Sequence, residues 1–402
     1  MTASPAQDAL RSLKIAELIL RALVEKVDAD EYLEQTRDRD RVLAPLATVS
    51  SAFRLAVRRL LHETLLFTGT KAIKRWLEAA GKRPDFPTKE LIFRDEYPFK
   101  AQEEGGNENA KWSFELVKQV VDTAVNVQRL DFLFFGRPQV PFSLLLSQNL
   151  RGVKHFTLGS PLQFESSKPS ALPFSLTKLE LIDTLGARMN RNAGWEETVR
   201  HLAAFPQVGR SLRYLALDGF IGSFIFAGPL IPLAAQLTQL SIPPILDVVK
   251  QDLLKMLLVI KNCYSLVYLR IGFFNSAMPP ILEDFPPATV RHLVIDLVQG
   301  TLGCGIPDLV DADLIKGNDT WKNLIQSLET RSGLVYLEIR DAMLLGMQRA
   351  LDLYDLCLAK GTHLCIEKCS DDLSQAEQLQ ELKDLIEATE DRRARAARLA
   401  WV

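Results

Sequence analysis

The chain reads Leu212-Arg-Tyr-Leu215-Ala-Leu217, in which one apolar residue is followed three positions later by a second and two positions after that by a third. The same spacing, with valine, isoleucine or phenylalanine at some positions, recurs along the chain, more weakly in its first and last copies. The other copies cover residues 88–93, 127–132, 153–158, 176–181, 237–242, 266–271, 290–295, 334–339 and 361–366. Repetition at intervals of roughly 20–50 residues is typical of a solenoid. We therefore predict one strand in each copy.

Apolar residues at helical spacing stand between several of these strands. The sets are Trp321, Leu324, Ile325 and Leu328; Leu116, Val120, Ala124 and Val127; Met347, Leu351, Tyr354 and Leu358; and Trp195, Val199 and Leu202. Spacings of three and four residues place such side chains on one helix face. The repeating unit is therefore predicted to be helix, turn and strand, an α/β solenoid with parallel strands on one edge and helices on the other.

Alternation along each strand predicts which side chains face away from the core. A first row stands just before the central apolar residue: Arg129, His155, Lys178, Tyr214, Gln239, Tyr268, His292, Tyr336 and His363. A second row stands just after it: Asp131, Thr157, Glu180, Ala216, Ser241, Arg270, Val294, Glu338 and Cys365. Tyrosine and arginine dominate protein-binding hot spots. The alternative to a binding role is that tyrosine stands on the exposed sheet face only because it favours strands.

Over residues 88–370 the pattern resembles leucine-rich repeats, although the asparagine or cysteine that normally follows the strand is mostly missing. The resemblance implies an irregular solenoid that binds a protein along its strands. The residues that we expect to bind this target are Lys178, Glu180, Tyr214, Tyr268, Arg270, His292, Tyr336 and Glu338.

A different, helical module is predicted before the strands. Its first helix, residues 13–27, carries an apolar face formed by Leu18, Ile19, Ala22 and Leu23. A charged segment, residues 28–41, is predicted as a solvated loop. Apolar residues then recur at steps of three and four: Val42, Leu46, Val49, Phe53, Ala56, Val57 and Leu60.

This module resembles an F-box. The resemblance rests on Glu17-Leu-Ile, on Leu43-Ala-Pro-Leu46-Ala-Thr-Val49-Ser-Ser-Ala-Phe53-Arg54 and on the apolar run to Phe67, with Lys14-Ile15 where the family has Leu-Pro. It implies the substrate receptor of an SCF-type cullin–RING ubiquitin ligase, a non-catalytic subunit. The Skp adaptor would bind through Leu18, Leu46, Val49 and Phe53. The alternative is a free-standing scaffold whose N-terminal helices only cap the solenoid.

We therefore predict four regions: a helical module at 10–68, a connecting helix and linker at 69–87, the solenoid at 88–370, and an amphipathic C-terminal helix at 371–402. Ser374-Gln-Ala-Glu377 is the capping box of that last helix. Its basic end, residues 392–398, suits the negative end of a helix dipole. A nuclear-localisation role is the other interpretation.

Composition narrows the function classes. The 402 residues are 47% hydrophobic with a net charge of −2, which favours neither nucleic acid nor a membrane surface as a partner. Five scattered cysteines are typical of reduced thiols, so we expect a cytoplasmic or nuclear protein. Residues 219–246 carry no formal charge, but their prolines and glycines favour a buried loop and strand over a membrane span.

Chemical motifs are not evident in the sequence. It contains no P-loop, no His-Glu-x-x-His and no Gly-x-Ser-x-Gly. His363, Cys365, Cys369 and Cys357 are close in sequence but lack the spacing of a zinc site. We expect no cofactor and no metal; an enzyme with an unrecognised site remains the weakest alternative.

Overall fold

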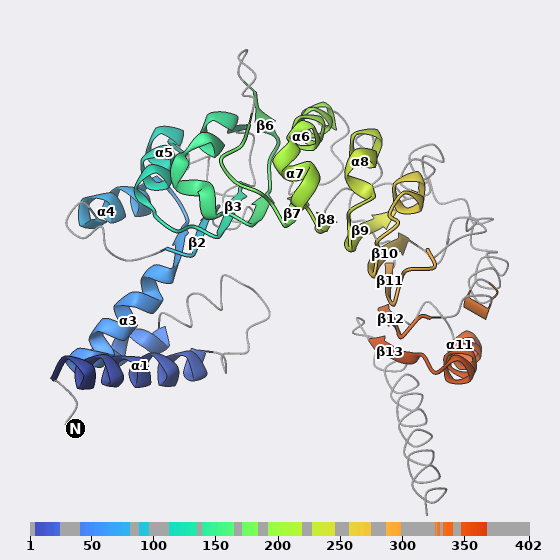
Figure 1. Ribbon diagram of the computed structural model, residues 1–402, viewed down its shortest axis with the longest axis horizontal. Helices are drawn as coiled ribbons and strands as arrows, with labels where there is room; N and C mark the ends of the chain where they lie inside the picture. Colours follow the sequence, from blue (N-terminus) through green and yellow to red (C-terminus); the bar gives the residue numbers. More distant parts are fainter. Residues whose placement is uncertain are drawn as a thin grey trace, which may run out of the picture. The chain divides into compact units, whose positions relative to one another are not determined.

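The computed structural model describes residues 5–24, 41–80, 88–95, 112–134, 139–164, 171–183, 192–218, 227–245, 257–274, 287–298, 326, 328–329, 333–340 and 347–367. These residues fall in two compact units, Met1–Leu176 and Thr177–Val402. Each unit combines helices with parallel strands (Figure 1). The chain is therefore an α/β protein, as its alternating patterns predict.

The first unit contains four neighbouring parallel strands. In sheet order they are β1 (Thr64–Phe67), β2 (Glu90–Arg94), β3 (Arg129–Leu133) and β5 (His155–Leu158). A separate parallel pair consists of β4 (Val140–Pro141) and β6 (Leu162–Gln163). The helices with defined bounds are α1 (Pro5–Val24), α3 (Ser51–Glu63), α4 (Thr70–Ala80) and α5 (Phe114–Thr123), with short 3₁₀ helices η2 (Phe142–Leu146) and η3 (Gln148–Gly152); residues 41–46 are helical as well.

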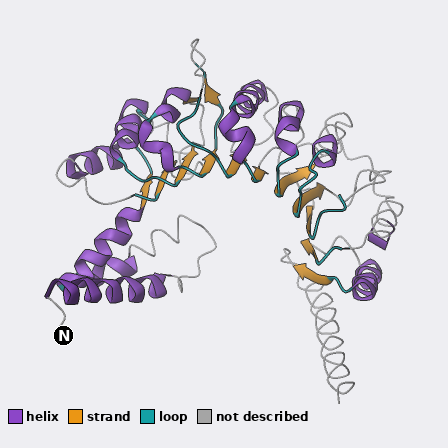
Figure 2. Ribbon diagram, in the orientation of Figure 1, coloured by secondary structure: helices purple, strands orange, loops and turns teal. Residues whose placement is uncertain are grey.

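The second unit contains seven neighbouring parallel strands. In sheet order they are β7 (Lys178–Ile182), β8 (Tyr214–Asp218), β9 (Gln239–Ile245), β10 (Tyr268–Phe274), β11 (His292–Val298), β12 (Tyr336–Arg340) and β13 (His363–Glu367). Its helices with defined bounds are α6 (Asn192–Ala204), α7 (Pro206–Ser211), α8 (Ala227–Ala234) and α11 (Met347–Lys360), and residues 257–261 are helical as well. These helices lie on one side of the strands, and among the described residues the other side is open (Figure 2).

All ten strands predicted from the repeated spacing are present, and each begins near the third position of the pattern. In the copy at β8, the three apolar residues Leu212, Leu215 and Leu217 are buried. The first unit uses larger side chains at the last apolar position, where the rings of Phe67, Phe93 and Phe132 stack with centroids 5.4 Å apart. The spacing therefore encodes a continuous core along the strands.

A ladder of backbone hydrogen bonds precedes the strands. The Thr177 carbonyl accepts from the amides of Arg213 and Tyr214 at 2.9 and 3.0 Å. The carbonyls of Arg213, Thr238, Val267 and Arg291 each accept two amides from the next strand in the same way. This backbone ladder satisfies main-chain groups beside strands that lack the asparagine or cysteine of regular leucine-rich repeats.

Three strands were not predicted: the short pair β4 and β6, and β1. The helical module was expected to continue to residue 68, whereas Thr64–Phe67 form β1 and pair in parallel with β2. The four residues Thr-Leu-Leu-Phe follow α3 without a glycine or proline that would mark a boundary in the sequence. The connecting helix expected after residue 69 is present as α4.

The predicted helix faces are only partly right. Trp195, Val199 and Leu202 of α6 are buried as expected. Of the set predicted around α5, Val120, Ala124 and Val127 are buried and Leu116 is half-buried, although the helix itself ends at Thr123 and also buries Val117 and Val121. In α11 Tyr354 is buried as expected and Leu358 is half-buried, while the side chains of Met347 and Leu351 lie outside the described part.

The N-terminal helices α1 and α3 pack on each other around a small core. That core consists of Leu13, Ala16, Leu20, Leu43, Ala56, Val57 and Leu60. Ser50 caps α3, since its hydroxyl accepts the Phe53 amide at 3.2 Å. Glu17 and Arg59 join the two helices with an ion pair of 3.0 Å.

The first helix differs from its prediction in two respects. It begins at Pro5 rather than Leu13, and it buries Leu13, Ala16 and Leu20. Leu18 and Ile19, two residues of the predicted apolar face, are exposed rather than packed on α3. The side chains of Ala22 and Leu23, also assigned to that face, lie outside the described part. The helix has two apolar faces, and spacing alone does not say which one packs on α3.

Several predictions fall outside the described residues. They are the loop at 28–40, the C-terminal helix at 371–402, the glycines at 300–305 and the helical positions Trp321, Leu324 and Ile325. Leu328, the last member of that helical set, is buried. Within the uncharged stretch, Ala227–Ala234 form α8, and none of the described helices is long and apolar enough to cross a membrane.

Candidate functional site

The open side of the second unit carries two rows of side chains in register and a less regular third row, because the pairing of β9 with β10 shifts after Ile271. The first row pairs Lys178 with Tyr214, Tyr214 with Gln239, and so on through Tyr268, His292, Tyr336 and His363. The second row runs through Glu180, Ala216, Ser241, Arg270, Val294, Glu338 and Cys365. All eight predicted target-binding residues therefore lie on one face, on β7, β8, β10, β11 and β12.

The second row is less open than predicted. Glu338 and Val294 are 7% and 1% exposed, and in the first unit Asp131 and Thr157 are also buried. In an in-register parallel sheet, each side chain of this row is flanked by neighbours about 4.8 Å away on both sides and by the first row along the strand. Contact with a partner is therefore expected mainly through the first row and through gaps in the second.

Aromatic rings stack along the first row at the far end of the sheet. The rings of His292 and Tyr336 lie 5.8 Å apart, and those of Tyr336 and His363 lie 5.4 Å apart with an interplanar angle of 24°. At the other end, the Lys178 ammonium lies 4.6 Å from the centre of the Tyr214 ring. The row is therefore a nearly continuous amphipathic ridge rather than a set of isolated side chains.

Ion pairs hold the charged residues of the face in place. Lys178 Nζ lies 2.8 Å from Glu180 Oε1, and Arg270 Nε donates to Asp296 Oδ2 at 2.6 Å. Arg340 donates from Nε to Glu338, along the same strand. Partly buried charged hydrogen bonds are stronger than neutral ones, so these pairs fix the shape of the face.

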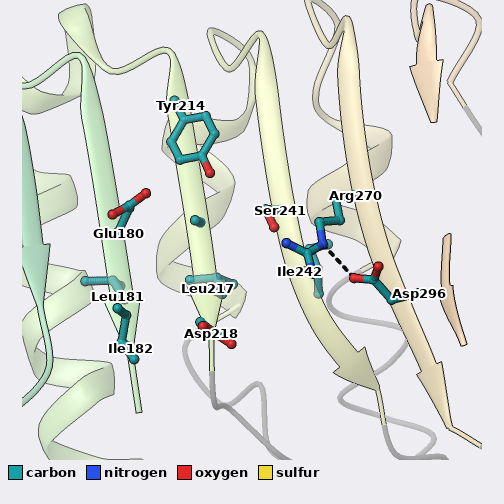
Figure 3. A pocket seen from close by; sticks show the side chains of 11 residues that line it. Glu180, Leu181, Ile182, Tyr214, Leu217, Asp218, Ser241, Ile242, Arg270 and Asp296 are labelled. Atoms are coloured by element: carbon teal, nitrogen blue, oxygen red, sulfur yellow. Dashed lines mark hydrogen bonds and ion pairs between the residues drawn. The ribbon is translucent and has the colours of Figure 1, made fainter. Parts of the chain in front are cut away.

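A pocket of about 270 Å³ lies in the middle of this face (Figure 3). Tyr214 stands at one end of it and Asp218 at the other, both on β8. Glu180 and Arg270 face each other across the strands between them. The volume is below the roughly 300–1,000 Å³ of small-molecule sites, which suits one side chain rather than a cofactor.

The tyrosines of the first row stay protonated. Burial, reinforced by the Glu180 carboxylate, raises the pKa of Tyr214 to about 12. Burial also raises the pKa of Tyr268. A hydrogen bond with Cys365, together with burial, raises the pKa of Tyr336. These hydroxyl groups therefore act as neutral hydrogen-bonding groups, not as acid–base catalysts at neutral pH.

Three residues of the face were missed by the sequence reasoning. Asp218, Asp296 and Arg340 form a third row, one residue beyond the last apolar position of the pattern. Extending the alternation by one more step would have found them. Ser241, assigned to the second row but not chosen as a binding residue, lies on the floor of the pocket.

The predicted adaptor-binding residues lie on the N-terminal helices. Leu18 on α1 is 67% exposed, and Val49, in the turn before α3, is 63% exposed. Leu46 and Phe53 are half-buried against the small core. Two of the four predicted residues are therefore fully available to a partner, and the other two are available in part.

Ile15 and Ile19 of α1 are exposed as well. With Leu18 they lie three and four residues apart, on the face of α1 that does not pack on α3. We call Ile15, Leu18 and Ile19 the outer face of α1. The sequence reasoning counted Leu18 and Ile19 in the apolar face of the first helix but did not include Ile15.

No metal site is formed by the histidine, cysteine, aspartate and glutamate side chains of the described ranges. Cys357 lies on the packed face of α11, where burial raises the pKa of its thiol to about 11. Burial raises the pKa of the Cys263 thiol to about 12. Neither thiol is therefore a ready ligand or nucleophile at neutral pH.

The chain matches no known family model, and no curated protein matches it.

Proposed function

We propose that this protein is the substrate receptor of an SCF-type cullin–RING ubiquitin ligase. The N-terminal helices bind the Skp adaptor, and the open face of the strands binds the protein to be ubiquitinated. The receptor holds its target without doing chemistry itself. The observation that carries the proposal is the exposure of Leu18 and Val49 on a packed two-helix module.

The exposed residues are informative because the module already has a core. Leu13, Leu20 and Leu60 are buried between α1 and α3. Leu18 and Val49 are exposed and do not belong to this core, so they remain accessible when the module is folded. Leu18 shares its exposed helix face with Ile15 and Ile19, and exposed apolar side chains gathered in this way are typical of interaction sites. A helix that presents apolar residues at three- and four-residue steps is a common docking element.

The second half of the proposal rests on the first row. Tyr214, Tyr268 and Tyr336 stand in one row on the alternate strands β8, β10 and β12 of an open face. Their rings offer large, stiff contact areas, and their hydroxyl groups remain donors at neutral pH. Such a face is suited to protein recognition over catalysis.

The alternative, a free-standing scaffold, is favoured by one observation. The helix α3 leads into β1 without a linker, and Glu63 at its end forms a 3.0 Å ion pair with Lys89, just before β2. The N-terminal helices are therefore joined closely to the first strands, as a cap would be. Capping uses the end of α3, whereas docking uses the outer face of α1 and Val49.

Calorimetric titration of the purified chain with the Skp adaptor tests the proposal. We expect binding with one adaptor per chain and an affinity at least tenfold weaker in Leu18→Asp and in Val49→Asp. Both positions are exposed, so the variants are expected to fold. Leu258→Asp changes an exposed leucine of the second unit and serves as the matched control. Absence of wild-type binding, or equal binding by all variants, would reject adaptor docking at this surface.

A further inference from the structure

The pocket on the open face exists because two small side chains lie next to each other. Ala216 and Ser241 are paired in the second row and form the floor. Glu180 precedes them in the row and Arg270 follows them. Because neighbouring strands lie about 4.8 Å apart, the two long side chains are separated by three strand spacings, which leaves a hollow between them.

The charges around this hollow are unequal. Three carboxylates line it, those of Glu180, Asp218 and Asp296, against the single guanidinium of Arg270. Asp296 is only 8% exposed, and its Oδ2 is held by Arg270. Its Oδ1 accepts no hydrogen bond within the described part of the chain, and Arg340 Nε lies 3.7 Å away. Lys178 pairs with Glu180 from outside the lining, so the feature of the pocket that suits a cation is a set of three lining carboxylates with unused acceptor capacity at Asp296 Oδ1.

One cation of the chain itself, the Lys178 ammonium, already lies beside two residues that line the pocket. The Lys178 ammonium lies 2.8 Å from Glu180 Oε1 and 4.6 Å from the centre of the Tyr214 ring. A carboxylate beside an aromatic ring is a favourable environment for ammonium and guanidinium groups. Glu180 and Tyr214 also line the pocket, so the same two groups are available to a cation that enters from outside.

We propose that this pocket receives an arginine or lysine side chain of the bound protein. The inference rests on the proposed function only in taking that protein to be the target. A phosphorylated side chain would bring negative charge next to the three carboxylates that line the pocket, at a cost set by Coulomb repulsion. A nucleic-acid strand is disfavoured for the same reason, because its phosphates require a positively charged groove.

Methyl NMR of the full chain tests the proposal without adaptor or target. The methyl groups of Ile182, Leu217 and Ile242 line the pocket and serve as probes. The ligands are N-acetyl-arginine amide, N-acetyl-lysine amide and N-acetyl-O-phosphoserine amide. We expect the two cationic amides to shift these methyl resonances in a saturable way and the phosphoserine amide to leave them in place.

Three variants assign the binding to the groups named here. Glu180→Gln with Asp218→Asn is expected to weaken binding of the arginine amide at least tenfold. Ala216→Leu fills the floor without changing charge and is expected to abolish the shifts. Lys178→Met removes the internal competitor, so it is expected to tighten binding several-fold.

The matched control removes two carboxylates elsewhere in the same unit, on α6. Glu196→Gln with Glu197→Gln is expected to keep the affinity within twofold of the wild type. Equal or stronger shifts with the phosphoserine amide would overturn the proposal, as would the absence of shifts with both cationic amides. Unchanged binding in the pocket variants would also overturn it. None of these results depends on whether the Skp adaptor binds.

Discussion

Glu63 is the residue that ties the end of α3 to its surroundings. Its Oε1 lies 2.7 Å from Arg21 Nη2 and 3.0 Å from Lys89 Nζ. Burial raises the pKa of the Glu63 carboxyl, but the hydrogen bonds and charges of Arg21 and Lys89 outweigh burial and lower it. A carboxyl whose pKa is lower in the folded than in the unfolded chain stabilises the fold. This stabilisation is fully present at pH values above the pKa of the unfolded chain, which is about 4.3 for glutamate.

Glu63→Gln is therefore expected to reduce stability at neutral pH by about 1 kcal/mol or less, as is typical of partly exposed ion pairs. The deficit should shrink as the pH falls through the lowered pKa of Glu63, because the wild-type carboxyl then becomes protonated and loses its advantage. Urea unfolding of the wild type and of Glu63→Gln, at neutral and at acidic pH, measures this difference in stability. Glu197→Gln, an exposed carboxylate on α6, is the control. A deficit that stays constant with pH would contradict this role.

At the residue scale, the first row was predicted from the sequence and the third row was not. Alternation within a strand is a local property, so Tyr214 and Tyr268 were placed on the open face directly. Asp296 lies beyond the last apolar residue, where the pattern no longer marks the strand. Its contact with Arg270 joins two strands through register, which a single sequence does not reveal.

The helix α1 shows why element faces are hard to assign from spacing alone. Leu13, Ala16 and Leu20 form the buried face, and Ile15, Leu18 and Ile19 form the outer face. Both sets have helical periodicity, so the sequence predicts an apolar helix but not its orientation. Packing against α3 decides it.

Leu20→Ala and Leu18→Ala are expected to differ sharply in stability, because Leu20 is fully buried and Leu18 is exposed. The first should lower the free energy of unfolding of the N-terminal helices by about 2–5 kcal/mol, the range for buried leucines. The second should change it by about 0.5 kcal/mol or less. Urea unfolding followed by circular dichroism measures both. Comparable losses would show that the outer face is packed, and would remove it as a docking surface.

The strands were the best-predicted elements, and a physical reason explains why. Their apolar positions alternate over only six residues, so each copy is recognisable without knowledge of its partners. The strand β1 was not predicted because it follows α3 directly. The 3₁₀ helices η2 and η3 were not predicted because they have no periodic pattern of apolar residues. The backbone carbonyl ladder before the strands was also invisible, because it uses no particular side chain.

At the scale of the whole molecule, the two proposed binding activities lie in different units. Leu18 and Val49 belong to the first unit, and the pocket lined by Tyr214 and Arg270 belongs to the second. A substitution in one surface is therefore expected to leave the other intact, since distant sites without shared partners act independently. The adaptor surface and the target surface can then be tested one at a time.

The central claim is that the N-terminal helices bind the Skp adaptor. Co-expression of the two proteins followed by size-exclusion chromatography with light scattering tests it most directly. We predict a single species whose mass is that of one 45.1 kDa chain plus one adaptor, and its loss in the Leu18→Asp, Val49→Asp double variant. A folded wild-type chain that elutes alone, at its own mass, would contradict the claim.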